Sequence, residues 1–90
     1  MVKLINDLYI DVAKDYNGTY RYALHVKTEG YKRQIGEQGF WRLNDCVNYA
    51  IDYTIKKRIK DKEYTIADVV KIAQEVNEEF KQIKELCKNL

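Results

Sequence analysis

The 90-residue chain has no proline and no serine, and it contains one histidine, one tryptophan and two cysteines. Without serine, no Ser-His-Asp triad can form. Cys46 and Cys87, the two cysteines of the chain, do not make a disulfide framework, and each falls at an apolar helical position, so we expect reduced core residues. A single histidine without a second ligand at metal-binding spacing makes no metal site. We therefore expect a protein without catalytic residues, metal or cofactor.

Long apolar runs, low-complexity tracts and internal repeats are also absent. Nothing at the N-terminus resembles a signal peptide, and no segment is long enough to cross a bilayer. A composition of 46% apolar and 33% charged residues predicts one soluble domain over residues 1–90, which we place in the cytoplasm. The net charge of +2 neither indicates nor excludes a nucleic-acid partner.

Alternating apolar residues predict a hairpin in the first third of the chain, with strands over Leu4–Lys14 and Thr19–Thr28. Asn17-Gly18 marks the turn. A two-residue loop would bring polar residues onto the apolar face. A three-residue loop over residues 16–18 avoids this, because its register pairs Val12 with Tyr22, Ile10 with Leu24, and Leu8 with Val26.

A two-residue turn at Glu29-Gly30 predicts a third strand from Tyr31 to about Glu37, with Ile35 opposite Leu24. The residues from Gly36 to Gly39 match the GxxG loop of KH domains, but they follow a strand, so we interpret them as a flexible connection. The large aromatics after this connection, Phe40 and Trp41, are expected to complete the core.

Two helices are predicted in the second half, the first from residues 42–44 to about Lys60 and the second from Thr65 to Leu90. Asp61–Glu63 form the break between them, and Thr65 with Asp68 forms a capping box. The predicted fold class is α+β, a three-stranded antiparallel meander followed by two antiparallel helices.

The second predicted helix is longer than the first. If a short loop makes them antiparallel neighbours, Ile59 lies near Ile66 and the C-terminal turns extend beyond the first helix. Either Phe40 and Trp41 cover this surplus, or a second molecule does. We expect an oligomer or partner contact there, made by Ile83, Leu86, Cys87 and Leu90.

The face of the sheet away from the helices is the candidate binding surface. It alternates basic, aromatic and polar residues, a pattern that suits a nucleic-acid or protein partner and also an ordinary solvated sheet face. His25 is expected to be a solvated surface residue there. The predicted partner-binding residues are Tyr9, Arg21, His25, Lys27, Lys32 and Arg33.

The order of elements, with Phe40-Trp41 before a helix that opens at Leu43-Asn44-Asp45-Cys46-Val47, resembles small phage-encoded accessory proteins. Such proteins include anti-CRISPRs and other inhibitors of host defence, which cover a surface of a larger host protein. The resemblance implies a non-catalytic protein that binds and inhibits a host protein such as a CRISPR effector.

Gly18, Lys32-Arg33 and Gly39-Phe40 also resemble the pattern of the three-stranded DNA-binding domain at the N-terminus of phage and transposon integrases. In that family the sheet enters the major groove of DNA. This resemblance implies the alternative function, binding of double-stranded DNA by Arg21, Lys27, Lys32 and Arg33.

Overall fold

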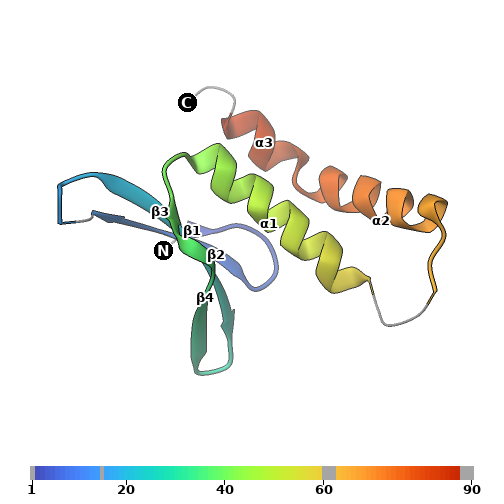
Figure 1. Ribbon diagram of the computed structural model, residues 1–90, viewed down its shortest axis with the longest axis horizontal. Coiled ribbons are helices and arrows are strands. Elements are labelled where there is room, and N and C mark those ends of the chain that lie inside the picture. The colour runs from blue at the N-terminus through green and yellow to red at the C-terminus, as the bar shows by residue number, and fades with distance from the viewer. Residues whose placement is uncertain (1, 15, 60–62, 88–90) are drawn as a thin grey trace.

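The computed structural model has an antiparallel sheet in its N-terminal half and helices in its C-terminal half (Figure 1). The structure describes residues 2–14, 16–59 and 63–87, with the backbone alone at residues 37 and 38. The sheet has the order β1-β2-β3-β4. The described elements are β1 (Val2–Lys3), β2 (Leu8–Lys14), β3 (Tyr20–Thr28), β4 (Tyr31–Phe40), α1 (Leu43–Arg58), α2 (Ile66–Glu79) and α3 (Lys81–Cys87). The predicted α+β meander is confirmed, with a short additional strand and a divided second helix.

The register of the β2–β3 hairpin is the predicted one. Its pairs include Leu8 with Val26, Ile10 with Leu24, and Val12 with Tyr22. Gly18 has φ 85°, the left-handed conformation that glycine adopts without steric cost. The predicted loop length depends on Asp15, which lies outside the described residues.

The prediction that the first strand begins at Leu4 is wrong. Residues 4–7 form a turn, and the strand begins at Leu8. The Leu4 N–H donates to the Leu8 carbonyl, the Leu8 N–H donates to the Ile5 carbonyl, and Asn6 has φ 51°. This turn folds the chain back, so that Val2 and Lys3 pair with β2 as the edge strand β1. Leu4 and Ile5 are adjacent apolar residues followed by Asn6 and Asp7, so the alternation that begins at Leu8 does not extend back over this turn.

The third predicted strand has the expected register, with Thr28 opposite Tyr31 and Leu24 opposite Ile35. It does not end at Glu37. Instead β4 continues to Phe40, which pairs with Tyr22 across a register shift. Gly36 has φ 80°, and a Cβ there would lie 3.2 Å from the Phe40 ring. The glycines predicted to form a flexible connection therefore form a bulge inside the strand.

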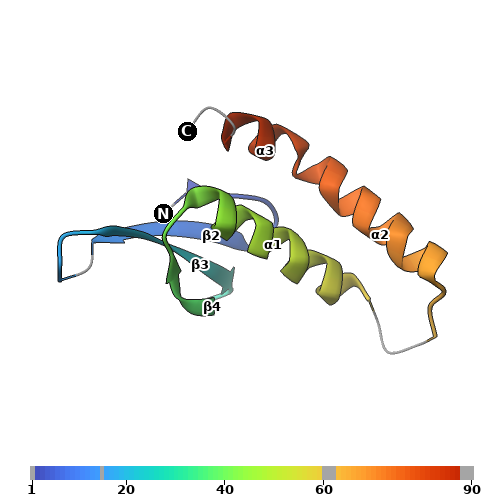
Figure 2. The ribbon, with the colours of Figure 1, turned by 45° about the horizontal axis from the view of Figure 1, so that its top comes forward.

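The core lies between one sheet face and the helices. The predicted stripe of α1 supplies its helical part, with Cys46, Val47, Ala50, Ile51 and Thr54 buried. The strands supply Leu8, Ile10, Leu24, Val26 and Ile35. No described helix covers the other face of the sheet (Figure 2).

The capping box that begins α2 is confirmed. The Asp68 N–H donates to the Thr65 hydroxyl at 3.1 Å, and the Thr65 N–H donates to the Asp68 carboxylate at 3.0 Å. These bonds satisfy two donors that a helix N-terminus otherwise leaves without a partner.

The predicted alignment of the two helices is wrong. The Arg58 guanidinium binds both carboxylate oxygens of Glu79, one of them at 2.7 Å, which places the last turn of α1 beside the last turn of α2. The N-terminal part of α2 therefore extends past the end of α1 (Figure 1). A connection of about seven residues can span roughly 23 Å, enough for this displacement.

The end of the apolar stripe that α1 does not cover is therefore the start of α2. Ile66 is 82% exposed, whereas Phe80, where the helix is interrupted, is fully buried. Of the residues predicted to make an oligomer contact, Cys87 is buried and Ile83 is half-buried against this chain's own core. Leu86 is 74% exposed, and Leu90 lies outside the described residues. The described helices include none long and apolar enough to cross a membrane.

Candidate functional site

The candidate site is the uncovered face of the sheet, which we call the outer sheet face. Strand pairing assigns its members, because directly opposed residues of paired strands point to the same side. Cross-strand pairs join Lys3 with Tyr9, Tyr9 with His25, His25 with Gln34, and Lys27 with Lys32. The complete set is Lys3, Tyr9, Asp11, Ala13, Arg21, Ala23, His25, Lys27, Lys32 and Gln34.

Positive charge predominates on the outer sheet face. It has four cations, Lys3, Arg21, Lys27 and Lys32, and Asp11 is the one acid among its described side chains. Lys27 and Lys32 are directly opposed, an arrangement that destabilises a sheet because like charges repel at this distance. Lys27 and Lys32 therefore repel each other on a sheet face that no described helix covers.

Aromatic rings lie close to these cations. The Arg21 guanidinium lies 3.7 Å from the centre of the Trp41 ring, and the Lys27 ammonium lies 5.6 Å from the centre of the Tyr9 ring. Both distances are within cation–π range. Trp41 is 59% exposed, so its predicted place in the core is wrong. Phe40 does pack on the core, where its ring centre lies 5.3 Å from that of Tyr49.

His25 is buried, with 8% exposure, and the prediction of a solvated surface histidine is wrong. Its cross-strand neighbours are Tyr9 and Gln34, both large enough to cover an imidazole. The Nδ1 atom has no hydrogen-bond partner among the described residues. Burial lowers the pKa of His25, the charge of Lys32 lowers it further, and Asp11 opposes the change.

This lowered pKa predicts a pH-dependent stability. The unfolded chain takes up the proton first, near the ordinary histidine pKa of about 6.5, so the free energy of unfolding should decrease as the pH falls through that value. Urea denaturation between about pH 8 and pH 5.5 would measure the decrease. We expect His25→Gln to reduce it. An identical pH dependence in the variant and the parent protein would contradict this assignment.

Arg33 does not join the other predicted partner-binding residues. It pairs with Val26, whose side chain is in the core, so Arg33 points to the helix side of the sheet, where it is exposed. The structure thus brings together Tyr9, Arg21, His25, Lys27 and Lys32 and separates Arg33 from them.

Sequence reasoning missed one cation of this surface, Lys3, and one exposed aromatic beside it, Trp41. Lys3 was missed because β1 has only two residues, too few for an alternating pattern to indicate a strand. Trp41 was assigned to the core because large aromatics beside a helix start commonly pack there. Its position just after a glycine-containing bulge was the available signal, since a bulge redirects the side chains near it.

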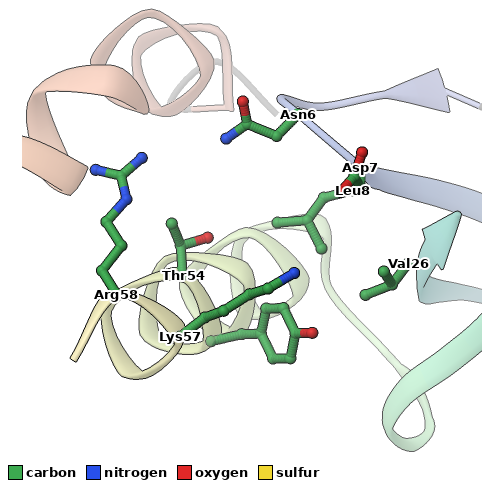
Figure 3. Close-up of a pocket in the computed structure, with 8 residues that line it drawn as sticks. Asn6, Asp7, Leu8, Val26, Thr54, Lys57 and Arg58 are labelled. Carbon is green, nitrogen blue, oxygen red and sulfur yellow. The ribbon is translucent and has the colours of Figure 1, made fainter. Parts of the chain in front are cut away.

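A pocket of about 470 Å³ lies on the helix side of the sheet, between the turn before β2 and the C-terminal half of α1 (Figure 3). Two of its polar groups have partners within the fold. The Thr54 hydroxyl donates to the Ala50 carbonyl, and Arg58 binds Glu79. This hydrogen bond from Arg58 lowers the pKa of Glu79. Because these two polar groups already have partners within the fold, we assign the pocket no ligand.

Residues 2–14, 16–59 and 63–87 contain no group of three or more histidine, cysteine or acidic residues arranged to hold a metal ion. Cys46 and Cys87 are both buried and unpaired, as predicted for reduced core residues. Burial raises the pKa of the Cys46 thiol to about 12. Since the reactive form of cysteine is the thiolate, this residue is an inert part of the core.

The sequence was compared with protein-family models and curated proteins, and the structure with solved structures; none of the three comparisons found a match.

Proposed function

We propose that the protein is a binding protein that contacts double-stranded DNA through its outer sheet face. The observation that carries the proposal is the direct opposition of Lys27 and Lys32 on a face with four cations and one described acid. A bound phosphate backbone would relieve this repulsion, because lysine and arginine neutralise phosphates and release their counterions.

The dimensions of the sheet support a duplex as the ligand. Three adjacent strands at about 4.8 Å spacing span roughly 10 Å, and the major groove of B-DNA is about 12 Å wide. The face is open, whereas the helices that stabilise it all lie behind it (Figure 2). The sequence resemblance to the integrase N-terminal domain, in which the sheet enters the major groove, favours the same mode of binding.

Fluorescence anisotropy with a labelled duplex of roughly 20 base pairs tests this proposal. Lys32→Ala should weaken binding several-fold and to a similar extent for unrelated DNA sequences, because a lost phosphate contact carries no sequence information. Arg33→Ala is the matched control, since it removes a neighbouring cation from the opposite side of the sheet. Equal losses in the two variants would exclude the outer sheet face as the binding surface.

A second candidate function is supported by exposed aromatic residues. Trp41 is 59%, Tyr20 59% and Tyr31 63% exposed, and tryptophan, tyrosine and arginine dominate the energetics of protein interfaces. This candidate is a phage accessory protein acting in the bacterial cytoplasm, which binds a host protein such as a CRISPR effector and inhibits it.

Trp41→Ala distinguishes the two candidates. An inhibitor of a host protein should lose its partner in an affinity pull-down from bacterial lysate when Trp41 is removed, while Lys32→Ala should have the smaller effect. A DNA-binding protein should show the reverse order in anisotropy. Failure to retain any host protein, together with unimpaired CRISPR interference in cells that express the chain, would exclude the inhibitor.

A further inference from the structure

His25 is buried on the outer sheet face by its neighbours in the sheet. It lies on β3, and its exposure is 8% although no described helix covers this face (Figure 2). Tyr9 lies directly opposite it on β2, and Gln34 lies directly opposite it on β4. The buried Nδ1 atom has no hydrogen-bond partner among the described residues. Because no bond from these residues fixes the state of this nitrogen, the charges around the ring decide its protonation.

Two lysine side chains lie at one end of this cross-strand row of Tyr9, His25 and Gln34. Lys27 is two residues along β3, and its ammonium lies 5.6 Å from the centre of the Tyr9 ring, so it reaches toward the row. Lys32 is directly opposite Lys27, and its charge is close enough to lower the pKa of His25. A phosphate held between the two ammonium groups would therefore lie beside the imidazole.

The remaining charges on this face do not cancel the effect of Lys32 on His25. Asp11 is the one acid among the described side chains of the face, and it favours the charged imidazole from β2. Burial and Lys32 act in the opposite direction and keep the pKa of His25 below its ordinary value. The other titratable groups on the face are Lys3 from β1, Tyr9 from β2, and Arg21 and Lys27 from β3. The imidazole of the free protein is therefore neutral at about pH 7.

We propose that Lys27, Lys32 and His25 form one phosphate-binding site, in which a bound phosphate draws a proton onto His25. The inference rests on the proposed DNA-binding function and adds a proton to it. Lysine binds phosphate as a point charge, and the phosphate places a negative charge where the imidazole otherwise meets the positive charge of Lys32. Because His25 is shielded from water, nearby charges act on it more strongly than on an exposed histidine. The phosphate acts through its charge and needs no contact with the buried Nδ1 atom.

Proton uptake gives DNA binding a pH dependence that lysine and arginine alone do not produce. The ordinary pKa values of these two residue types lie far above the range from pH 8 to pH 5.5, so their charges stay constant across it. The DNA-bound protein holds the proton on His25 more tightly than the free protein does, so the association constant should rise as the pH falls. We expect an increase of about threefold or more over this range, and of no more than about tenfold per pH unit, because one proton is taken up.

Fluorescence anisotropy with a labelled duplex at constant salt, between pH 8 and pH 5.5, measures this increase. Circular dichroism at each pH shows whether the protein is folded. His25→Gln should remove the pH dependence, because glutamine does not titrate. Lys32→Ala should make it shallower, since the repulsion that DNA offsets is then already absent. Arg33→Ala is the matched control: it removes a cation from the opposite side of the sheet and should leave the pH dependence unchanged.

A second measurement needs no variant. His25 is the only histidine of the chain, so its imidazole signals in the NMR spectrum need no further assignment. A pH titration of these signals should give a higher pKa for the DNA-bound protein than for the free protein. Inorganic phosphate, compared with chloride at equal ionic strength, distinguishes the two sources of phosphate. An equally raised pKa with inorganic phosphate would confirm the phosphate site but assign it to a small phosphate compound.

Duplex binding that does not depend on pH, or a pKa of His25 that DNA leaves unchanged, would overturn this inference and leave the proposed function intact. Equal changes of the pH dependence in Lys32→Ala and Arg33→Ala would overturn it as well, because His25 would then not respond to the lysine beside it. Absence of duplex binding at every pH, together with no effect of inorganic phosphate on His25, would overturn both the inference and the proposed function.

Discussion

Replacing Phe80 with alanine should lower the free energy of unfolding by about 3–5 kcal/mol. Phe80 is fully buried at the junction of α2 and α3, in the same cluster as Val76 and Cys46. The deletion of its ring removes favourable burial and leaves a cavity, and both effects destabilise the folded state. A domain of this size has only about 5–15 kcal/mol of stability in total, so the variant should be partly unfolded well below the melting temperature of the parent protein.

Urea denaturation followed by circular dichroism measures this effect, with Ile66→Ala as the control. Ile66 belongs to the same apolar stripe, yet it is 82% exposed, so its replacement should change stability by about 0.5 kcal/mol or less. If instead Ile66→Ala were strongly destabilising, the start of α2 would be packed against α1, and the alignment of the two helices at Arg58 and Glu79 would be incorrect.

Lys32→Glu should strongly weaken duplex binding and at the same time stabilise the fold. The change replaces the directly opposed lysines with a cross-strand pair of opposite charge, Lys27 and the new carboxylate. Such pairs contribute about 0.2–1 kcal/mol, whereas like charges at this position are unfavourable. The variant also loses one contact to a DNA phosphate, and its new carboxylate is repelled by the phosphates. We therefore expect the affinity for duplex DNA to fall by well over tenfold.

A substitution that weakens binding and raises stability identifies a residue that serves binding although it lowers the stability of the fold. The measurements are anisotropy with duplex DNA and urea denaturation of the same preparation, with Arg33→Glu as the control. Because Arg33 lies on the other side of the sheet, Arg33→Glu should weaken DNA binding less. A Lys32→Glu protein that binds DNA as the parent does would remove the functional explanation for the opposed lysines.

The parts of this fold that sequence patterns predicted correctly depend on local geometry. The alternation of Leu8, Ile10 and Val12 allowed one register that keeps apolar residues together, and the structure has that register. The capping box at Thr65 was predicted because its two bonds join residues three apart. The turn at Glu29-Gly30 was predicted for a similar reason.

The errors concern relations between distant parts of the chain. An apolar stripe shows which face of a helix is buried, but it does not show where along its partner the helix lies, so the position of α2 relative to α1 could not be derived. The stripe also continues through Phe80 without a break and gave no sign that the helix divides there. β1 was missed because two residues are too short a pattern.

The sequence predicted most residues of the candidate site, but the predicted face of Arg33 and the predicted exposure of His25 were wrong. Period-two alternation correctly grouped Tyr9, Arg21, Lys27 and Lys32, since residues of paired strands share a face. Arg33 was included because the Lys32-Arg33 pair belongs to the pattern that resembles the integrase domain, although adjacent strand residues point to opposite faces. The burial of His25 could not be derived, because it depends on neighbouring side chains in two other strands.

The salt dependence of duplex binding tests the central claim, that the outer sheet face is a surface for DNA, most directly. If Lys3, Arg21, Lys27 and Lys32 contact phosphates, a plot of the logarithm of the association constant against the logarithm of salt concentration should have a slope of about −3 to −4. Lys32→Ala should make the slope shallower by about one unit, and Arg33→Ala should leave it unchanged. A slope near zero, or no binding at about 50 mM salt, would contradict the account.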